Sequence, residues 1–448
     1  MANNITLNAA TVGGGQTAAS EDIGGLQFQR IKLALGASGQ DTGDISSVNP
    51  LPVEIGGSSV SVFGDLITAE NTPLLQVDFV YGINTQTGVT SVVTTGVAGT
   101  DASRLRLQTG TGAAGAALYT TKRTAKYRPG QGMTVRFTTV YTTGAASSTQ
   151  IHGVGTAENG YFFGFNGSSF GILHRNNSVD TWTLQGAWNG DKCDGSGYSL
   201  FTLIPTFGNV YQIRYPYLGY GNITFWIQDA GTGHWLRAHT IEYTNSSVST
   251  ELRNPNMTFY MQAVNRGNTS NLIMYSGSMA ALLSGVLAYL GNPKWAYDNN
   301  KTGITAETSV FALKVATTYN GVTNRGSIRL NSVSVGCNAT NAVAVLRFKI
   351  GATLAGTATY VPIDGATADD GVTITAGNSI VSVNTLHSTV TAATGQYFFN
   401  MSINGASNMT IDLGSLNLVV APGEVLSLGV FSTASANASV SLNWSEDI

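Results

Sequence analysis

Two aspartates in a short loop come nearest to a metal site in this sequence. The segment Asn189–Gly195 (NGDKCDG) holds Asp191 and Asp194, and carboxylates are the ligands that calcium prefers. Cys193 stands at the fifth position of this segment, where an EF-hand loop needs an oxygen ligand. Two alternatives stay open: a calcium site of another kind on Asp191 and Asp194, or an aspartate-ordered turn without any cofactor.

Aromatic side chains between residues 211 and 235 could stack on sugar rings, with Asn222 and Gln228 supplying hydrogen bonds. Tyr217, Tyr220 and Trp235 lie near turns, where binding residues concentrate, so they are the glycan-binding candidates. The alternative is that these aromatic residues only build the core of a β-sandwich.

Two motif matches lack the context that catalysis requires. Gly110–Gly115 fits the GxGxxG string of dinucleotide sites, but no helical pattern follows and the next acidic residue is Glu158. Gly167–Gly171 fits the GxSxG string of hydrolases, but another strand-like run follows, which predicts a hairpin. No acid/base pair of carboxylates can be assigned, so we expect no enzyme; a polysaccharide-degrading enzyme remains the alternative.

The elements that carry these residues are predicted to be strands. Charged residues make up 10% of the chain, against roughly 25% in ordinary soluble domains, and 54 of the 448 residues are glycine. Such a chain has too few Glu, Lys and Arg residues to solubilise helices. A hydrophobic content of 42% excludes intrinsic disorder. The fold class is therefore all-β.

Strand patterns divide the chain into two antiparallel β-sandwiches of jelly-roll or lectin-like type behind an extended N-terminal arm. We expect the arm at 1–70, a lectin-like sandwich at 71–291, a linker at 292–303 and a second sandwich at 304–448. In the second sandwich the alternation predicts three inward-facing sets: Leu346, Phe348 and Ile350; Met409, Ile411 and Leu413; and Val440, Leu442 and Trp444.

The arm contains a patterned segment, Leu26–Leu33, and an extended proline segment, Asn49–Val53. It is too glycine- and proline-rich to build a core, so we expect it to lie along a partner; a disordered leader is the alternative. The expected attachment residues are Gln27, Phe28, Arg30, Lys32, Pro50 and Pro52.

The same two segments resemble the N-terminal region of certain tailed-bacteriophage virion proteins. Phe170–Arg175, Leu218–Gly221, His239–Ile241 and Ser441–Glu446 are similar to the same group. This resemblance implies a structural component of the tail fibre, baseplate or head fibre, with other virion proteins as partners and a location in the virion. Capsid decoration is an alternative role, and contact with host surface glycans is compatible with either.

Charge and hydropathy restrict the remaining partners. The net charge of −3 provides no basic field, so we expect no nucleic-acid partner; the short basic run Lys122–Arg128 is expected to face solvent. The longest apolar run, Met279–Leu290, is too short for membrane insertion. We expect synthesis in the host cytoplasm without a signal peptide, and free thiols at Cys193 and Cys337.

The segment Gly371–Ile411 contains no Asp, Glu, Lys or Arg. Sheet edges without charged residues are prone to pair with other chains, so we expect them to be covered in a closed homo-oligomer. The resemblance to phage fibres implies that this oligomer is a homotrimer.

Overall fold

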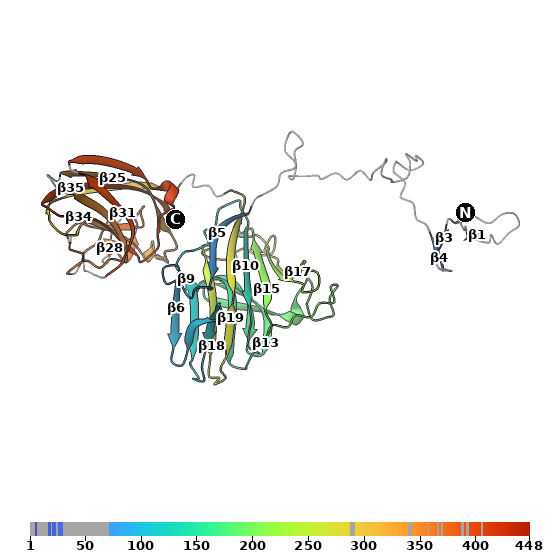
Figure 1. The fold of residues 1–448 in the computed structure, drawn as a ribbon. Coiled ribbons are helices and arrows are strands. Elements are labelled where there is room, and N and C mark those ends of the chain that lie inside the picture. Colours follow the sequence, from blue (N-terminus) through green and yellow to red (C-terminus); the bar gives the residue numbers. More distant parts are fainter. Residues whose placement is uncertain are drawn as a thin grey trace. The chain divides into compact units, whose positions relative to one another are not determined.

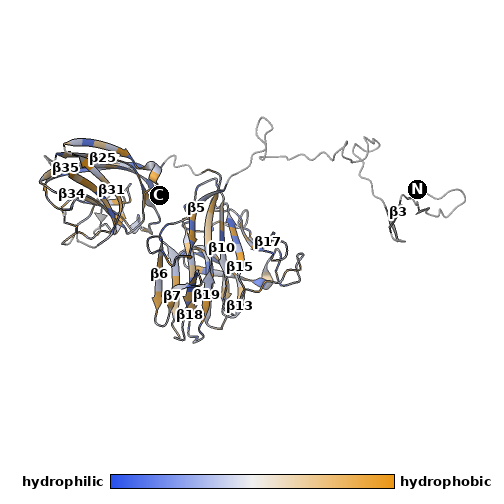
Figure 2. Ribbon diagram, in the orientation of Figure 1, coloured by the Kyte–Doolittle hydropathy of each residue, from blue (hydrophilic) through white to orange (hydrophobic). Residues whose placement is uncertain are grey.

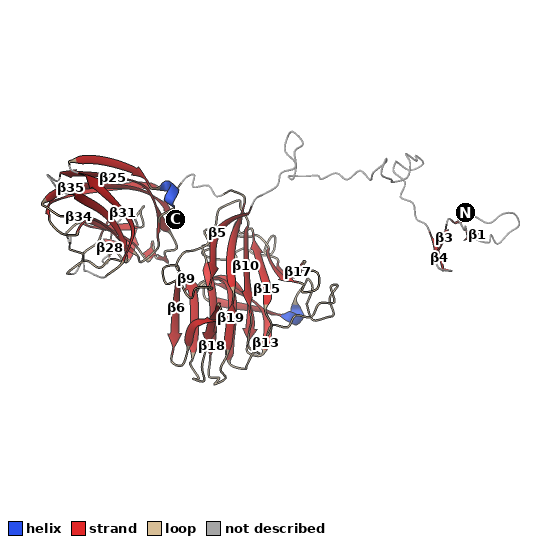
Figure 3. Ribbon diagram, in the orientation of Figure 1, coloured by secondary structure: helices blue, strands red, loops and turns tan. Residues whose placement is uncertain are grey.

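A computed structural model describes residues 71–286 and 292–448, with gaps at 339–342, 357, 365–366, 369–370, 387–388, 391–393 and 405. It also gives the backbone of four short strands near the N-terminus. The chain divides into two compact units, Met1–Ala69 and Glu70–Ile448. The predicted all-β class is confirmed: helical residues in the described part are limited to two short 3-10 turns, η2 (Gln185–Ala187) and η3 (Gly414–Leu416) (Figure 3). None of the helices described could cross a membrane.

In the first unit, two pairs of short strands are described. Strand β1 (Ile5–Thr6) pairs with β2 (Thr17–Ala18), and β3 (Ser20–Ile23) pairs with β4 (Leu26–Gln29). The expected attachment residues Gln27 and Phe28 fall in β4, although only its backbone is described. Arg30, Lys32, Pro50 and Pro52 lie outside the described residues.

The first sandwich is built from three antiparallel sheets (Figure 1). Its six-stranded sheet has the order β17 (Trp235–Ile241), β16 (Ile223–Gln228), β15 (Asn209–Tyr215), β10 (Met133–Thr139), β20 (Ser278–Ser284), β5 (Asn71–Asp78). Its seven-stranded sheet has the order β14 (Val179–Leu184), β13 (Ser169–Asn176), β12 (Gly160–Asn166), β11 (Ser148–Gly155), β18 (Thr258–Asn265), β9 (Ala116–Thr121), β6 (Gly88–Val93). A small third sheet contains β19 (Ile273–Ser276), β8 (Arg104–Gln108) and β7 (Val97–Asp101).

Strand alternation places the core between the two large sheets. On β10, Val135 and Phe137 are buried while Arg136 between them is only half-buried. On β15, Tyr211 and Ile213 enter the same core, which is rich in aromatic rings. Figure 2 shows this alternation of apolar and polar residues along the strands. One face of each large sheet is therefore committed to this core. The opposite face of the seven-stranded sheet is also partly buried, by a second cluster of Ile151, Phe162, Leu173 and Tyr260, whereas on the six-stranded sheet it carries exposed and half-buried polar side chains.

The second sandwich has two larger sheets and one small sheet. The five-stranded sheet contains β21 (Lys294–Ile304), β35 (Ala436–Asp447), β25 (Ser327–Asn338) and β32 (Ser407–Asp412) in this order, with β33 (Val419–Val420) also pairing with β25. The six-stranded sheet has the order β27 (Val361–Pro362), β30 (Val381–Asn384), β22 (Thr308–Val315), β34 (Val425–Ser432), β26 (Val343–Ile350), β31 (Gln396–Asn404). The small sheet contains β24 (Val322–Thr323), β23 (Thr318–Tyr319), β29 (Thr373–Thr375) and β28 (Thr367–Ala368).

The predicted linker at 292–303 is wrong, because most of it forms strand β21. This strand pairs with the C-terminal strand β35, so that Trp295 lies opposite Trp444. Trp295 and Tyr297 pack against the second core, while the alternate residues Lys294, Ala296 and Asp298 are exposed. Within the polar run that suggested a linker, Asp298 and Asn300 are exposed, whereas Asn299 and Lys301 are half-buried and donate to the carbonyls of Val310 and Thr385.

The predicted inward-facing residues of the second sandwich are confirmed except for Met409: in its set, Leu413 is fully buried and Ile411 packs against the core. Val440, Leu442 and Trp444 are fully buried, as are Leu346 and Phe348. Met409 is 41% exposed, which contradicts its prediction as a core residue. The reason is that β32 is the last strand of its sheet. Its sequence alternates like that of a central strand, but no neighbouring strand covers its free edge.

Candidate functional site

The outer face of the six-stranded sheet in the first sandwich carries a row of large polar and aromatic side chains. Cross-strand pairing places Arg136 of β10 opposite Gln212 of β15, Gln212 opposite Trp226 of β16, and Trp226 opposite Arg237 of β17. The neighbouring rows add Arg214 and Trp235. We call these six residues the arginine–tryptophan face: Arg136, Gln212, Arg214, Trp226, Trp235 and Arg237.

Two cation–π contacts organise this face. The guanidinium carbon of Arg214 lies 4.9 Å from the centre of the Trp226 ring, and that of Arg136 lies 5.6 Å from the centre of the Trp235 ring. The Trp226 indole N–H also donates a hydrogen bond of 2.9 Å to the Thr224 hydroxyl. Both indoles are therefore held on the sheet while each stays partly exposed.

Gln212 sits at the centre of the face, completely buried beneath its neighbours. Its Oε1 accepts a hydrogen bond of 2.8 Å from Nε of Arg136. Its Nε2 has no hydrogen-bond partner. Unpaired buried N–H groups are uncommon in folded proteins, so this amide marks a place where an acceptor is expected.

The charge of the face is uncompensated. Arg136, Arg214 and Arg237 form no ion pair with any carboxylate among the described residues. Burial, and secondly the charge of Arg136, lower the pKa of Arg214 below its ordinary value. The six strands of this sheet contain a single carboxylate, that of Asp78 at the end of β5. Asp78 and Arg136 both line a shallow open pocket beside the face.

The structure does not bring the three predicted glycan-binding residues together. Tyr217 and Tyr220 lie in the turn between β15 and β16, where their hydroxyls donate to the carbonyls of Leu252 (2.7 Å) and Val248 (3.2 Å). Trp235 lies at the opposite end of the β16–β17 hairpin, opposite Gln228. The six residue steps from Asn222 to Gln228 span roughly 20 Å at about 3.3 Å per step. Trp235 alone belongs to the arginine–tryptophan face.

Sequence reasoning missed Arg136, Gln212 and Arg214 as functional candidates. Their signal is the alternation Tyr211-Gln212-Ile213-Arg214-Tyr215, in which Gln212 and Arg214 must share the face opposite the core. Trp226 belongs to the aromatic run for which sugar stacking and a core role were both left open. It lies between the buried residues Phe225 and Ile227 and therefore points to the outer face.

The carboxylates proposed for calcium are occupied by their own loop. The buried Asp191 accepts hydrogen bonds from the backbone N–H groups of Cys193 (2.8 Å) and Ser199 (2.9 Å). Asp194 accepts from the N–H and hydroxyl of Ser196, and these bonds lower its pKa. Within the described residues no group of three or more His, Cys, Asp or Glu side chains could hold a metal ion. This geometry favours an aspartate-ordered turn.

Both cysteines are free thiols, as expected, and both are buried. Burial, with smaller contributions from nearby aspartates such as Asp191, raises the pKa of the Cys193 thiol to about 12. Burial also raises the pKa of the Cys337 thiol. Neither thiol has the lowered pKa that a reactive cysteine needs.

Neither glycine motif forms a catalytic loop. The predicted hairpin is confirmed: β12 and β13 pair antiparallel, with Asn166 opposite Ser169 across the turn. Gly110–Gly115 falls in the turn between β8 and β9, and β9 rather than a helix follows it. Within this turn, a Cβ on Gly115 would lie 2.1 Å from the Thr109 carbonyl oxygen, so glycine is required there by packing.

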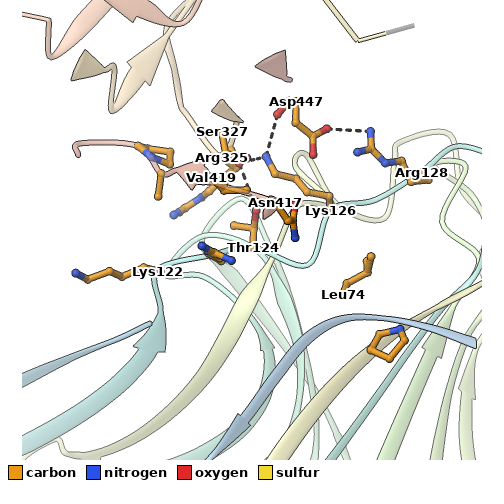
Figure 4. Close-up of a pocket in the computed structure, with 14 residues that line it drawn as sticks. Leu74, Lys122, Thr124, Lys126, Arg128, Arg325, Ser327, Asn417, Val419 and Asp447 are labelled. Carbon is orange, nitrogen blue, oxygen red and sulfur yellow. Dashed lines mark hydrogen bonds and ion pairs between the residues drawn. The ribbon is translucent and has the colours of Figure 1, made fainter. Parts of the chain in front are cut away.

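A second cluster of charges lines a small pocket of about 130 Å³ (Figure 4). Arg128 forms an ion pair of 2.9 Å with Asp447, and Nζ of Lys126 donates to the Asp447 carbonyl at 3.0 Å. Desolvation by burial lowers the pKa of Lys126 to about 8, against the opposing charge of Asp447. The expectation that this basic run faces solvent is therefore wrong for Lys126 and Arg128. Both side chains contact Asp447 at the end of the last strand, β35.

No family model and no curated protein matches the chain. Among solved structures, it is similar to the cellulose induced protein Cip1 (13% identity, TM-score 0.32, covering 46% of this chain and 96% of that one). It is also similar to the carbohydrate recognition domain of Emp47p (9%, TM-score 0.30, 49% and 98%). A third similar structure is a glycoside hydrolase family protein from Mycobacterium thermorestibile (12%, TM-score 0.33, 46% and 99%). These similarities are too weak to assign a function.

Proposed function

We propose that the chain is a non-enzymatic structural component of a tailed-phage virion whose first sandwich contacts host surface glycans. The virion role rests on the sequence resemblance described above. The glycan contact rests on one observation, namely that Trp226 and Trp235 are held by arginines on the outer face of the six-stranded sheet. Partly exposed aromatic rings flanked by planar hydrogen-bond donors suit the apolar faces and hydroxyl groups of sugars.

Binding is favoured over cleavage by the distribution of carboxylates. Hydrolysis of a glycosidic bond generally requires two of them, about 5–10 Å apart. The six strands that carry the face contain only Asp78, at the margin. If the chain is a polysaccharide-degrading tail enzyme, its acid/base pair must lie outside this sheet. If it only decorates the capsid, the arginine–tryptophan face has no ligand to bind.

The edges of the second sandwich are suited to self-association, and the resemblance to phage fibres implies that the oligomer is a homotrimer. Strands β31 and β32 end the six-stranded and five-stranded sheets, respectively, and both arise from the uncharged region of the sequence. Asp412 at the end of β32 is their single charged residue, whereas the edge strand β21 carries Lys294, Asp298 and Lys301. Charged residues protect an edge against pairing, so β31 and β32 are the edges suited to a neighbouring copy.

The glycan contact is tested with the purified full chain and host surface polysaccharide. We expect saturable binding without depolymerisation, weakened at least about tenfold, or roughly 1.4 kcal/mol, by Trp226→Ala combined with Trp235→Ala. The matched control is Trp182→Ala, which removes a half-buried indole from β14 of the other large sheet. Depolymerisation would instead support the alternative of a polysaccharide-degrading enzyme. Binding of unchanged affinity in the double variant would exclude this face as the glycan-binding site.

A further inference from the structure

The centre of the arginine–tryptophan face offers hydrogen-bond donors without a protein acceptor. Because Arg136 already uses Oε1 of Gln212, the remaining polar atom of this buried amide is the Nε2 donor. The guanidinium groups of Arg136 and Arg214 bring only further donors. A ligand that satisfies this set must supply acceptor oxygens.

The electrostatics point the same way. Arg136 and Arg214 lie on adjacent strands without a carboxylate partner among the described residues, and their like charges disfavour one another. Arg237 adds a third positive charge at the end of the row. A bound anion would relieve this repulsion and gain charge-assisted hydrogen bonds.

A purely structural role explains the arginines and the indoles but leaves the amide unexplained. An unpaired buried N–H costs roughly 1–3 kcal/mol of stability. If residue 212 had only a packing role, an apolar side chain there would therefore give a more stable protein. Arg136 reaches from β10 to the Trp235 ring on β17, across Gln212. Three strand spacings of about 4.8 Å separate β10 from β17, so both side chains must lie flat over the sheet. The amide of Gln212, on a strand between them, is fully buried.

We propose that Arg136, Gln212 and Arg214 form an anion seat that binds the acidic group of a charged saccharide, either a carboxylate, a sulfate or a phosphate. This inference rests on the proposed glycan contact and names its chemical class. The anion accepts hydrogen bonds from Nε2 of Gln212 and from the guanidinium groups, after a shift of the exposed Arg214 side chain or of Arg136. The sugar ring that carries the anion packs against Trp226 or Trp235.

Binding of defined polymers to the full chain tests the class of ligand. The probes are dextran sulfate, polygalacturonate, neutral dextran and polyphosphate, measured by interferometry on immobilised protein. We expect dextran sulfate or polygalacturonate to bind at least about tenfold more tightly than dextran, a difference of roughly 1.4 kcal/mol. The binding should weaken strongly in about 0.5 M salt, because screening shortens the range of the arginine charges.

Two substitutions in the seat separate a binding role from a structural one. Arg214→Gln should weaken acidic-glycan binding at least about tenfold. Gln212→Glu supplies a carboxylate to both arginines from within the protein, so it should abolish binding while the thermal transition stays or rises. The control is Arg253→Gln, which removes the same charge from an exposed position outside the face.

The outcomes distinguish this inference from the proposed function. Equal binding of dextran and dextran sulfate, unaffected by Arg214→Gln, would overturn the anion seat and leave the glycan contact standing. Unchanged acidic-glycan binding in a folded Gln212→Glu variant would also overturn the seat. Binding of polyphosphate without any saccharide, or of no polymer at all, would overturn both.

Discussion

Glu251 should make the first sandwich less stable as the pH rises. Its side chain is completely buried, and neither carboxylate oxygen has a hydrogen-bond partner. The nearby phenols of Tyr161 and Tyr215 are also buried without normal hydrogen bonds. Burial raises the pKa of Glu251 from 4.5 to about 8, with Tyr161 opposing part of this effect. The folded state therefore prefers the neutral acid.

The magnitude follows from this pKa difference. Between about pH 4.5 and pH 8 the folded chain binds a proton that the unfolded chain has released, so the free energy of unfolding falls as pH rises. Below this window no penalty exists, and above it the penalty is complete. A difference of about 3.5 pH units corresponds to at most about 5 kcal/mol, which relaxation and water entry would reduce.

The perturbation is Glu251→Gln, which keeps the shape of the side chain and removes its titration. We expect the variant to lose most of the fall in stability between about pH 6.5 and 8 and to be several kcal/mol more stable than the parent at pH 9. Below about pH 6.5 the buried His152, whose pKa burial lowers to about 3, contributes a slope of the opposite sign in both proteins. The assay is urea unfolding at a series of pH values, followed by tryptophan fluorescence. Because two sandwiches unfold, the transition that shifts in this variant is the one assigned to the first.

Glu446 provides the matched comparison in the second sandwich. It is also completely buried with a raised pKa, but its carboxylate accepts hydrogen bonds from Ser379 (2.6 Å), the backbone of Ile380 (2.9 Å) and Trp444 (3.2 Å). Glu446→Gln should lower stability at pH 7 by about 1–3 kcal/mol, since it weakens these bonds. A Glu251→Gln variant that is less stable than the parent at pH 9, or that keeps the pH slope, would refute the argument.

Two further predictions concern assembly. Deletion of residues 1–55 should leave the thermal transitions of both sandwiches intact and abolish incorporation into virions; normal incorporation, or loss of cooperative unfolding, would contradict it. Met409→Lys places a charge on the exposed edge strand β32 and should shift the proposed homo-oligomer towards monomer in light scattering at micromolar concentration. A parent chain that is already a stable monomer would exclude intrinsic association through this edge.

Local patterns in the sequence were sufficient for the fold class and for several elements. The scarcity of charged residues and the abundance of glycine determined an all-β chain. Period-two alternation placed Val440, Leu442 and Trp444 in the core, because that periodicity belongs to each strand alone. The turn at Gly167 was also predictable, since a two-residue hairpin depends only on its own residues.

Pairing between distant strands decided the rest. Strand β21 is a strand because β35, more than a hundred residues later, supplies its ladder, and no local pattern reveals that partner. Met409 alternates as a core residue would, but its exposure depends on the edge position of β32. Arg136, Gln212 and Trp226 come from three strands, and only the inter-strand register aligns them in one row. The alternation of residues along one strand determines which face of the sheet a side chain occupies. The register between strands determines which side chains become its neighbours, and the candidate site depends on those neighbours.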